Sequence, residues 1–169
     1  MFCDYERKLF TKLNGYGIIK ALESNLSLIH YGGQKMRLDG FGLLVENMPE
    51  MIRFYRDIMG FEIKEDESTN NVYLVKDGTL FLLYGRNDFE KMTGRKYEYL
   101  KGLNGHFEIA LYVDTFEEVD REYARIIAQG GRPVLEPTTE PWGQRTCYIA
   151  DPEGNLIEIG SFNRPFDRG

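Results

Sequence analysis

Hydrophobic and polar residues alternate along several short segments of the chain, which is the pattern of a β-strand with one buried face. The clearest is 106–113, whose apolar positions would face a core: Phe107, Ile109, Leu111 and Val113. Its other positions would form the opposite face: His106, Glu108, Ala110 and Tyr112. Residues 154–160 repeat the pattern, with Glu158 between two isoleucines. A carboxylate in the middle of a strand face is unusual, and these two strands therefore carry candidate functional residues.

The order of elements occurs twice from Met36 onward. The first half is predicted as a strand at 40–46, a helix at 49–60, and strands near 61–67, 71–77 and 79–85. The second half is predicted as a strand at 106–113, a helix at 116–130, and strands at 132–137, 145–151 and 155–162. Each half is therefore a β-α-β-β-β module, which predicts an α+β fold made of modules 37–86 and 105–162. Residues 86–105 join the modules and are predicted to be helical in part.

Both predicted helices have start and stop signals. Asn47 can cap the first helix, and Thr115 with Glu118 three residues later forms a capping box for the second. Gly60 and Gly130 are placed to end them.

Composition narrows the class of protein. The chain has 169 residues, enough for one domain with a core, and no apolar run long enough to span a bilayer. A net charge of −6 without a basic cluster argues against nucleic acid as the main partner. Two cysteines far apart form neither a disulfide framework nor a zinc pattern, which favours the cytoplasm. Cys147 is predicted to be a buried small apolar residue rather than a nucleophile.

Residues 1–35 do not resemble a signal peptide, because acidic residues lie among the early basic ones and no cleavage site follows. Two interpretations remain open for this extension. It is either an accessory helix that packs on the domain, or over-extended translation upstream of a natural start at Met36. The domain itself is expected to span residues 36–169.

Strand alternation also predicts a face of each module that is turned away from its helix. In the first module this face carries Gly40, Gly42, Leu44, Leu80, Leu82 and Tyr84. In the second module it carries Glu108 and Glu158 beside the small residues Ala110 and Gly160. A surface of small residues with a few polar ones leaves room for a ligand.

The duplicated module, together with "FYRDIMGFE" (54–62) and "PWGQRTCYIADPEGNLIEI" (141–159), resembles the vicinal oxygen chelate superfamily of glyoxalases, extradiol dioxygenases and bleomycin-resistance proteins. The resemblance covers residues 37–162. It implies two tandem βαβββ modules that form a curved mixed sheet with a cleft. It also implies that the protein is a homodimer and that its enzymatic relatives bind a divalent metal in the cleft.

The family's four usual metal-ligand positions correspond to Gly40, Leu82, Glu108 and Glu158. Only Glu158 matches the family's preferred ligands, and Gly40 and Leu82 have no side chain that binds a metal. Two carboxylates would form at best a partial site for Zn, Ni, Mn or Fe, with His106 as a third candidate ligand. This departure puts metal-dependent chemistry in doubt.

Several side chains have both a binding and a structural interpretation. Glu108 and Glu158 would receive a cationic group or act as a general base, or else lie half-solvated or paired with Arg145. Trp142, in the loop 136–145, would stack on a planar ligand or close the edge of the core. Arg145 would bind substrate oxygens or form an ordinary salt bridge. The tyrosines on the ligand face are further candidates for ligand contact: Tyr84, Tyr112 and Tyr148.

Two functions follow from this resemblance. The first is a glyoxalase- or bleomycin-resistance-like protein that binds a small organic molecule in the β cleft without a complete metal site. The alternative is a metal-dependent lyase or isomerase of the lactoylglutathione lyase type, acting on a small carbonyl or thiol adduct. Neither nucleic acid nor a membrane is an expected partner.

Overall fold

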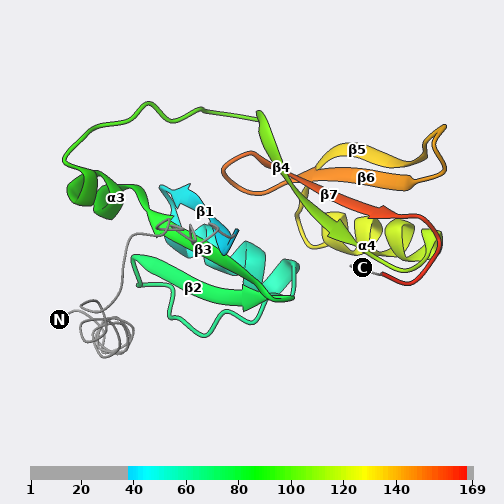
Figure 1. The fold of residues 1–169 in the computed structure, drawn as a ribbon, viewed down its shortest axis with the longest axis horizontal. Helices are drawn as coiled ribbons and strands as arrows, with labels where there is room; N and C mark the ends of the chain where they lie inside the picture. The colour runs from blue at the N-terminus through cyan, green and yellow to red at the C-terminus, as the bar shows by residue number, and fades with distance from the viewer. Residues whose placement is uncertain (1–37, 167–169) are drawn as a thin grey trace, which may run out of the picture. The chain divides into compact units, whose positions relative to one another are not determined.

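The computed structural model describes residues 38–166, and their strands form two β-sheets (Figure 1). The first sheet has the order β1-β3-β2 and is formed by β1 (Gly40–Val45), β2 (Asn71–Lys76) and β3 (Thr79–Gly85). The second has the order β4-β7-β6-β5 and is formed by β4 (Asn104–Tyr112), β5 (Arg132–Thr139), β6 (Arg145–Ala150) and β7 (Asn155–Ser161). The first and last strands of each module pair in parallel, and the remaining pairs are antiparallel. The predicted α+β class and duplicated module are confirmed.

The helices begin where the sequence signals predict. The first module has α2 (Met48–Arg53) continued by the π-helix η1 (Phe54–Ile58), and the second has α4 (Phe116–Ala128). The Asn47 side chain accepts from the backbone N–H of Glu50, and both hydrogen bonds of the Thr115–Glu118 capping box are present. The connection between the modules contains α3 (Arg86–Thr93), which confirms the predicted partial helix. Gly60 has φ 72° just beyond η1, as expected of a helix stop.

The strand predicted near 61–67 is wrong. The structure has no strand in this segment, although Phe61 and Ile63 are buried, 5% and 6% exposed. At the neighbouring edge of the sheet, the backbone N–H of Tyr73 donates to the Glu65 side chain at 3.3 Å rather than to a strand partner. Two buried side chains in an irregular segment therefore produced the alternation that was interpreted as a strand.

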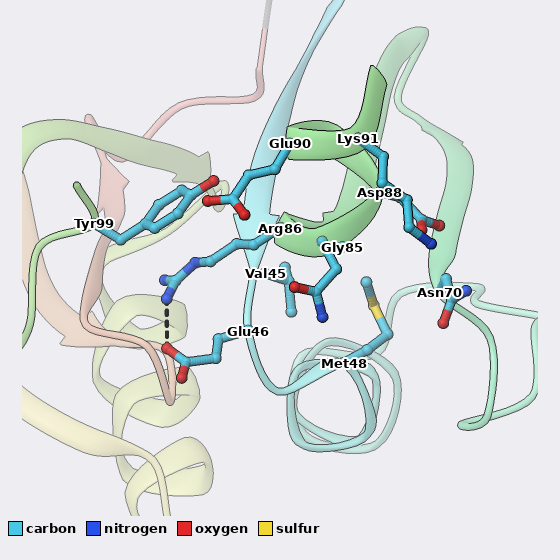
Figure 2. Close-up of a pocket in the computed structure, with 11 residues that line it drawn as sticks. Val45, Glu46, Met48, Asn70, Gly85, Arg86, Asp88, Glu90, Lys91 and Tyr99 are labelled. Atoms are coloured by element: carbon cyan, nitrogen blue, oxygen red, sulfur yellow. Dashed lines mark hydrogen bonds and ion pairs between the residues drawn. The ribbon is translucent and has the colours of Figure 1, made fainter. Parts of the chain in front are cut away.

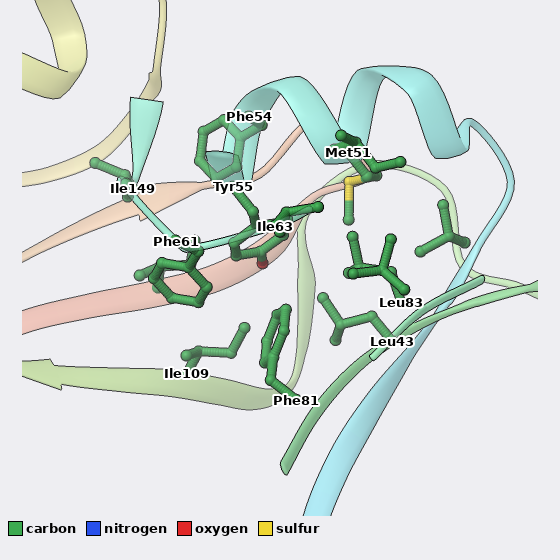
Figure 3. Packing of buried hydrophobic residues seen from close by; sticks show 14 of the residues in the cluster. Leu43, Met51, Phe54, Tyr55, Phe61, Ile63, Phe81, Leu83, Ile109 and Ile149 are labelled. Carbon is green, nitrogen blue, oxygen red and sulfur yellow. The ribbon is translucent and has the colours of Figure 1, made fainter. Parts of the chain in front are cut away.

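One hydrophobic core includes residues of both modules (Figure 3). Tyr55 lies at its centre, with its ring centroid 5.4 Å from that of Phe61 and 5.0 Å from that of Phe81. Ile109 and Ile149 of the second module belong to the same cluster. Packing of apolar side chains therefore joins the two modules.

The turn 151–154 of the second module makes polar contacts with the first. Asp151, which is fully buried, accepts a 3.0 Å hydrogen bond from the Tyr55 hydroxyl. Glu153 accepts from the backbone N–H groups of Glu46 and Asn47 at 2.7 and 2.9 Å. The turn therefore fixes how the modules dock.

None of the helices in residues 38–166 is long and apolar enough to cross a membrane. The predicted N-terminal extension, residues 1–35, and the proposed start at Met36 lie outside the described residues.

Candidate functional site

The face of the second sheet turned away from α4 holds both predicted carboxylates. Strand register aligns Ala110 of β4 with Glu158 of β7 and Tyr148 of β6. The nine side-chain positions of this open face are Glu108, Ala110, Tyr112, Thr146, Tyr148, Ala150, Leu156, Glu158 and Gly160. Five of the alternate residues of these strands are buried in the hydrophobic core, which also includes Val119 and Ile126 of α4: Ile109, Cys147, Ile149, Ile157 and Ile159. One of them is Cys147, which confirms its predicted burial; that burial raises the pKa of its thiol to about 12.

A chain of hydrogen bonds holds the carboxylate of Glu158. Its Oε1 accepts from Thr146 Oγ1 at 2.8 Å and from Gln144 Nε2 at 3.1 Å. The amide oxygen of Gln144 in turn accepts from the indole N–H of Trp142 at 2.9 Å. Gln144 and Thr146 were missed from the sequence, although Thr146 shares the alternation of Tyr148 and Gln144 stands beside Trp142. The predicted loop residue and the predicted carboxylate are thus parts of one network.

Gly160 makes room for this network. A Cβ atom at position 160 would lie 2.6 Å from Gln144 Nε2, closer than real contacts of that kind. A larger residue would displace the Gln144 amide from Glu158. Glycine at position 160 therefore leaves the space that the hydrogen bond between Gln144 and Glu158 needs.

The carboxylate of Glu108 accepts a hydrogen bond from a side chain of another strand in the same sheet. The hydroxyl of Tyr148 donates to Glu108 Oε2 at 2.8 Å. Partial burial, followed by this hydrogen bond, raises the pKa of Tyr148 well above its usual value. Tyr148 therefore keeps its proton near neutral pH and acts as a hydrogen-bond donor.

Neither carboxylate pairs with a basic side chain within residues 38–166. Arg145, the partner considered from the sequence, instead pairs with Asp120 of α4 at 2.6 Å and donates to Thr139 at 3.0 Å. It takes the salt-bridge role that the sequence left open. The open face therefore presents two carboxylates that lack a basic partner in the described part of the chain.

His106 lies where the strand alternation is interrupted. The register of β4 on β7 shifts between Asn104 and Glu108, so that His106 falls within the irregularity. Its backbone N–H donates to the Asn104 side chain at 3.0 Å. Strand alternation therefore no longer supports placing its ring beside Glu108. The same irregularity leaves Phe107, predicted to face the core, 42% exposed.

The two other predicted tyrosines have structural contacts. Tyr84 packs edge-on against Phe89 of α3, with ring centroids 6.1 Å apart, and its hydroxyl contacts Met92. Tyr112 holds the C-terminal residues, with its hydroxyl donating to the carbonyl of Arg164 at 2.8 Å. Trp142 is 65% exposed and is thus available to a ligand.

The residues at the family's metal positions do not fit a complete metal site. A Cβ atom at Gly40 would lie 2.1 Å from the Leu80 carbonyl oxygen, so that no donor side chain fits there without a backbone shift. Leu82 has no donor atom in its side chain, and only Glu108 and Glu158 remain. Within residues 38–166, no three acidic, histidine or cysteine side chains are grouped to hold a metal.

A cavity of about 500 Å³ lies elsewhere, at the start of α3 (Figure 2). Two of its charged groups already have partners: Arg86 pairs with Glu46, and Asp88 accepts from Asn71 at 3.2 Å. The ring of Tyr99 lies over the Arg86 guanidinium at 4.3 Å. The cavity therefore surrounds a structural arginine, whereas the open face of the second sheet presents carboxylates that lack basic partners among the described residues.

Comparison with known proteins identifies the family of the chain. Residues 37–159 match the model of the Glyoxalase/Bleomycin resistance protein/Dioxygenase superfamily. The chain belongs to this superfamily. The two-module arrangement seen here is consistent with the fold of this superfamily, whose name covers glyoxalases, bleomycin-resistance proteins and dioxygenases.

Individual proteins resemble the chain in sequence or in fold. An uncharacterized protein of Bacillus subtilis, YraH, is 28% identical over 127 residues, which cover 73% of this chain and 97% of that protein. A hypothetical protein of S. aureus has a TM-score of 0.60 at 25% identity, covering 76% of this chain and 93% of that one. A lactoylglutathione lyase of Agrobacterium tumefaciens has a TM-score of 0.60 at 24% identity, covering 75% and 94%. The last similarity concerns the fold alone.

Proposed function

We propose that this superfamily member binds a small planar cation on the open face of its second sheet. The observation that carries the proposal is the pair Glu108 and Glu158, two carboxylates on one face without a basic partner in residues 38–166. A bound cation would supply that partner through charge-assisted hydrogen bonds.

The hydrogen bonds around the carboxylates support binding. Tyr148 holds one oxygen of Glu108, while Gln144 and Thr146 hold one oxygen of Glu158. Each carboxylate is thus oriented by its neighbours and retains a second oxygen for a ligand. Preorganised groups of this kind lose little entropy on binding.

Trp142 supports a planar shape for the ligand. Its indole N–H is fixed by Gln144, the residue that also contacts Glu158. Its ring is 65% exposed, and stacking on a planar cation would combine apolar contact with cation–π attraction. The ligand would therefore lie between Trp142 and the carboxylates.

The residues at the family's metal positions do not support a metal-dependent step. They supply two carboxylates as donors, because Gly40 and Leu82 occupy the other two ligand positions. The lyase or isomerase alternative relies on a metal to polarise the substrate, and no observation in residues 38–166 favours it over binding.

The test uses thioflavin T, a planar aromatic cation, titrated by calorimetry into the wild-type protein and Glu158→Gln. We expect Glu158→Gln to weaken binding by about 10- to 100-fold, because a hydrogen bond to a charged group is worth about 1.5–3 kcal/mol. Glu108→Gln should act in the same direction. Trp142→Leu should weaken binding by about 2- to 10-fold through loss of ring stacking.

Glu117→Gln is the matched control, because this exposed carboxylate lies on α4. It removes the same charge and should leave the affinity unchanged. Equal weakening by Glu117→Gln would show that only net charge matters and would contradict a site at Glu158. Tighter binding of the anion anilinonaphthalene sulfonate than of thioflavin T would also contradict it.

We further propose that the protein is a homodimer in which the first sheet's face is covered by a second copy. Val75 of β2 is 68% exposed and pairs with Leu80 of β3, and Leu82 lies on the same face. Val75→Asp should shift sedimentation from dimer towards monomer at a fixed protein concentration. A wild-type protein that sediments as a monomer at all concentrations tested would contradict this proposal.

A further inference from the structure

The chain turns back after β7 and ends its described part beside β4. Asn163 has a φ of 57°, in the left-handed region, and its backbone N–H donates to Ser161 Oγ at 2.9 Å. Three residues later, the backbone N–H of Phe166 donates to Asp114 Oδ1 at 3.1 Å. We call residues 162–166 the C-terminal strap.

Tyr112 contacts the strap through both its hydroxyl and its ring. The Tyr112 hydroxyl donates to the Arg164 carbonyl at 2.8 Å and accepts from the Phe162 backbone N–H at 3.2 Å. The rings of Tyr112 and Phe166 contact each other in a tilted arrangement, with centroids 5.1 Å apart and planes at 36°. The hydroxyl and the ring of Tyr112 are therefore both engaged by the strap.

Tyr112 borders the proposed binding site. It pairs with Gly160, and the preceding pair on the same face is Ala110 with Glu158. Two residues along a strand span about 7 Å, which is the reach of a small aromatic ligand. A ligand that extends from Glu158 along this face would meet the side chain that the strap occupies.

The strap itself is weakly buried. Phe162 is 41% exposed and Phe166 is 54% exposed. Opening the strap would therefore expose little additional apolar surface to water. Segments with few buried contacts open at low free-energy cost, and moving elements beside binding sites are drawn from them.

We propose that the C-terminal strap is an autoinhibitory contact, which occupies Tyr112 when the open face is empty and is displaced when a ligand binds there. The inference rests on the proposed binding function. It assigns Tyr112 two alternative partners, the strap in the closed state and the ligand in the open state. The closed state therefore lowers the apparent affinity by the fraction of molecules in which Tyr112 is free.

The test compares Phe166→Ala with the wild-type full chain. Losing an aromatic pair worth about 0.5–1.5 kcal/mol should favour the open strap and tighten thioflavin T binding by about 2- to 10-fold. Amide hydrogen exchange at Phe162, read by NMR without ligand, should become faster in the same variant. Phe107→Ala is the matched control, because Phe107 is a similarly exposed phenylalanine of β4, 42% exposed, and should change neither readout.

The outcomes separate the strap from the binding function. Faster exchange with unchanged affinity, or weaker binding in Phe166→Ala, would contradict autoinhibition while the binding function stands. Unchanged exchange would show that the Phe166 ring does not hold the strap, which also contradicts the inference. Failure of thioflavin T to bind either protein would contradict the binding function, and the inference with it.

Discussion

Arg86→Ala is expected to lower the free energy of unfolding by about 3–5 kcal/mol, because it leaves the mostly buried carboxylate of Glu153 without its cation. Arg86 pairs with Glu153 at 2.6 Å and with Glu46 at 2.5 Å, and its Nε donates to the Leu44 carbonyl at 2.9 Å. The side chains of Arg86 and Glu153 are only 17% and 12% exposed. These contacts connect the end of the first module with the turn 151–154 of the second. The variant should therefore loosen the docking of the modules.

Urea unfolding followed by the fluorescence of Trp142, the only tryptophan in the sequence, measures this effect. Arg53→Ala is the control, because its ion pair with Glu67 joins side chains that are 52% and 36% exposed. An exposed pair contributes at most about 1 kcal/mol. An Arg86→Ala variant no less stable than Arg53→Ala would refute the role given to Arg86.

Tyr55→Ala is expected to destabilise the protein by about 3–5 kcal/mol, the usual cost of removing a large buried aromatic ring. Tyr55 is fully buried among Phe54, Phe61 and Phe81 and joins the core of the two modules. Tyr55→Phe keeps the ring and removes only the hydroxyl that donates to Asp151. It should cost about 1–3 kcal/mol, because the buried carboxyl loses a donor. Equal losses in both variants would show that ring packing contributes nothing at this position.

The Tyr55 hydroxyl also predicts how stability depends on pH. Burial, and then the nearby charge of Asp151, raise the pKa of Tyr55 well above 10 in the folded protein. In the unfolded chain the pKa of a tyrosine is about 10. The stabilisation of the folded protein by the protonated Tyr55 hydroxyl is therefore complete below pH 10 and is lost as the pH rises above it. The stability difference between wild type and Tyr55→Phe should therefore shrink above pH 10. A difference that is constant from neutral pH to above pH 10 would contradict this assignment.

The local signals in the sequence predicted local structure well. The Asn47 cap and the Thr115–Glu118 capping box depend on residues three apart, and both are present. The segment 61–67 was predicted wrongly, because two buried residues in an irregular segment alternate as a strand does. Sequence alternation reports burial, whereas a strand also requires a partner for its backbone.

The candidate site could be predicted only in part. The alternation of side chains within each strand predicted that Glu108 and Glu158 point away from the helix of their module. This prediction needs only the sequence of each strand. The partner of Arg145 is Asp120, 25 residues away, and the strap contacts Tyr112 from about 50 residues along the chain. Such choices depend on how the elements pack, which no short sequence pattern encodes. The bulge before Glu108, which undermines the placement of His106, is likewise set by pairing with β7.

NMR amide shifts on titration with thioflavin T report directly where the cation binds. We expect the largest changes on Ala110, Tyr148 and Glu158 and on the indole N–H of Trp142. Largest changes around the cavity at Arg86, or on the strands of the first sheet, would contradict a binding site between Trp142 and the two carboxylates.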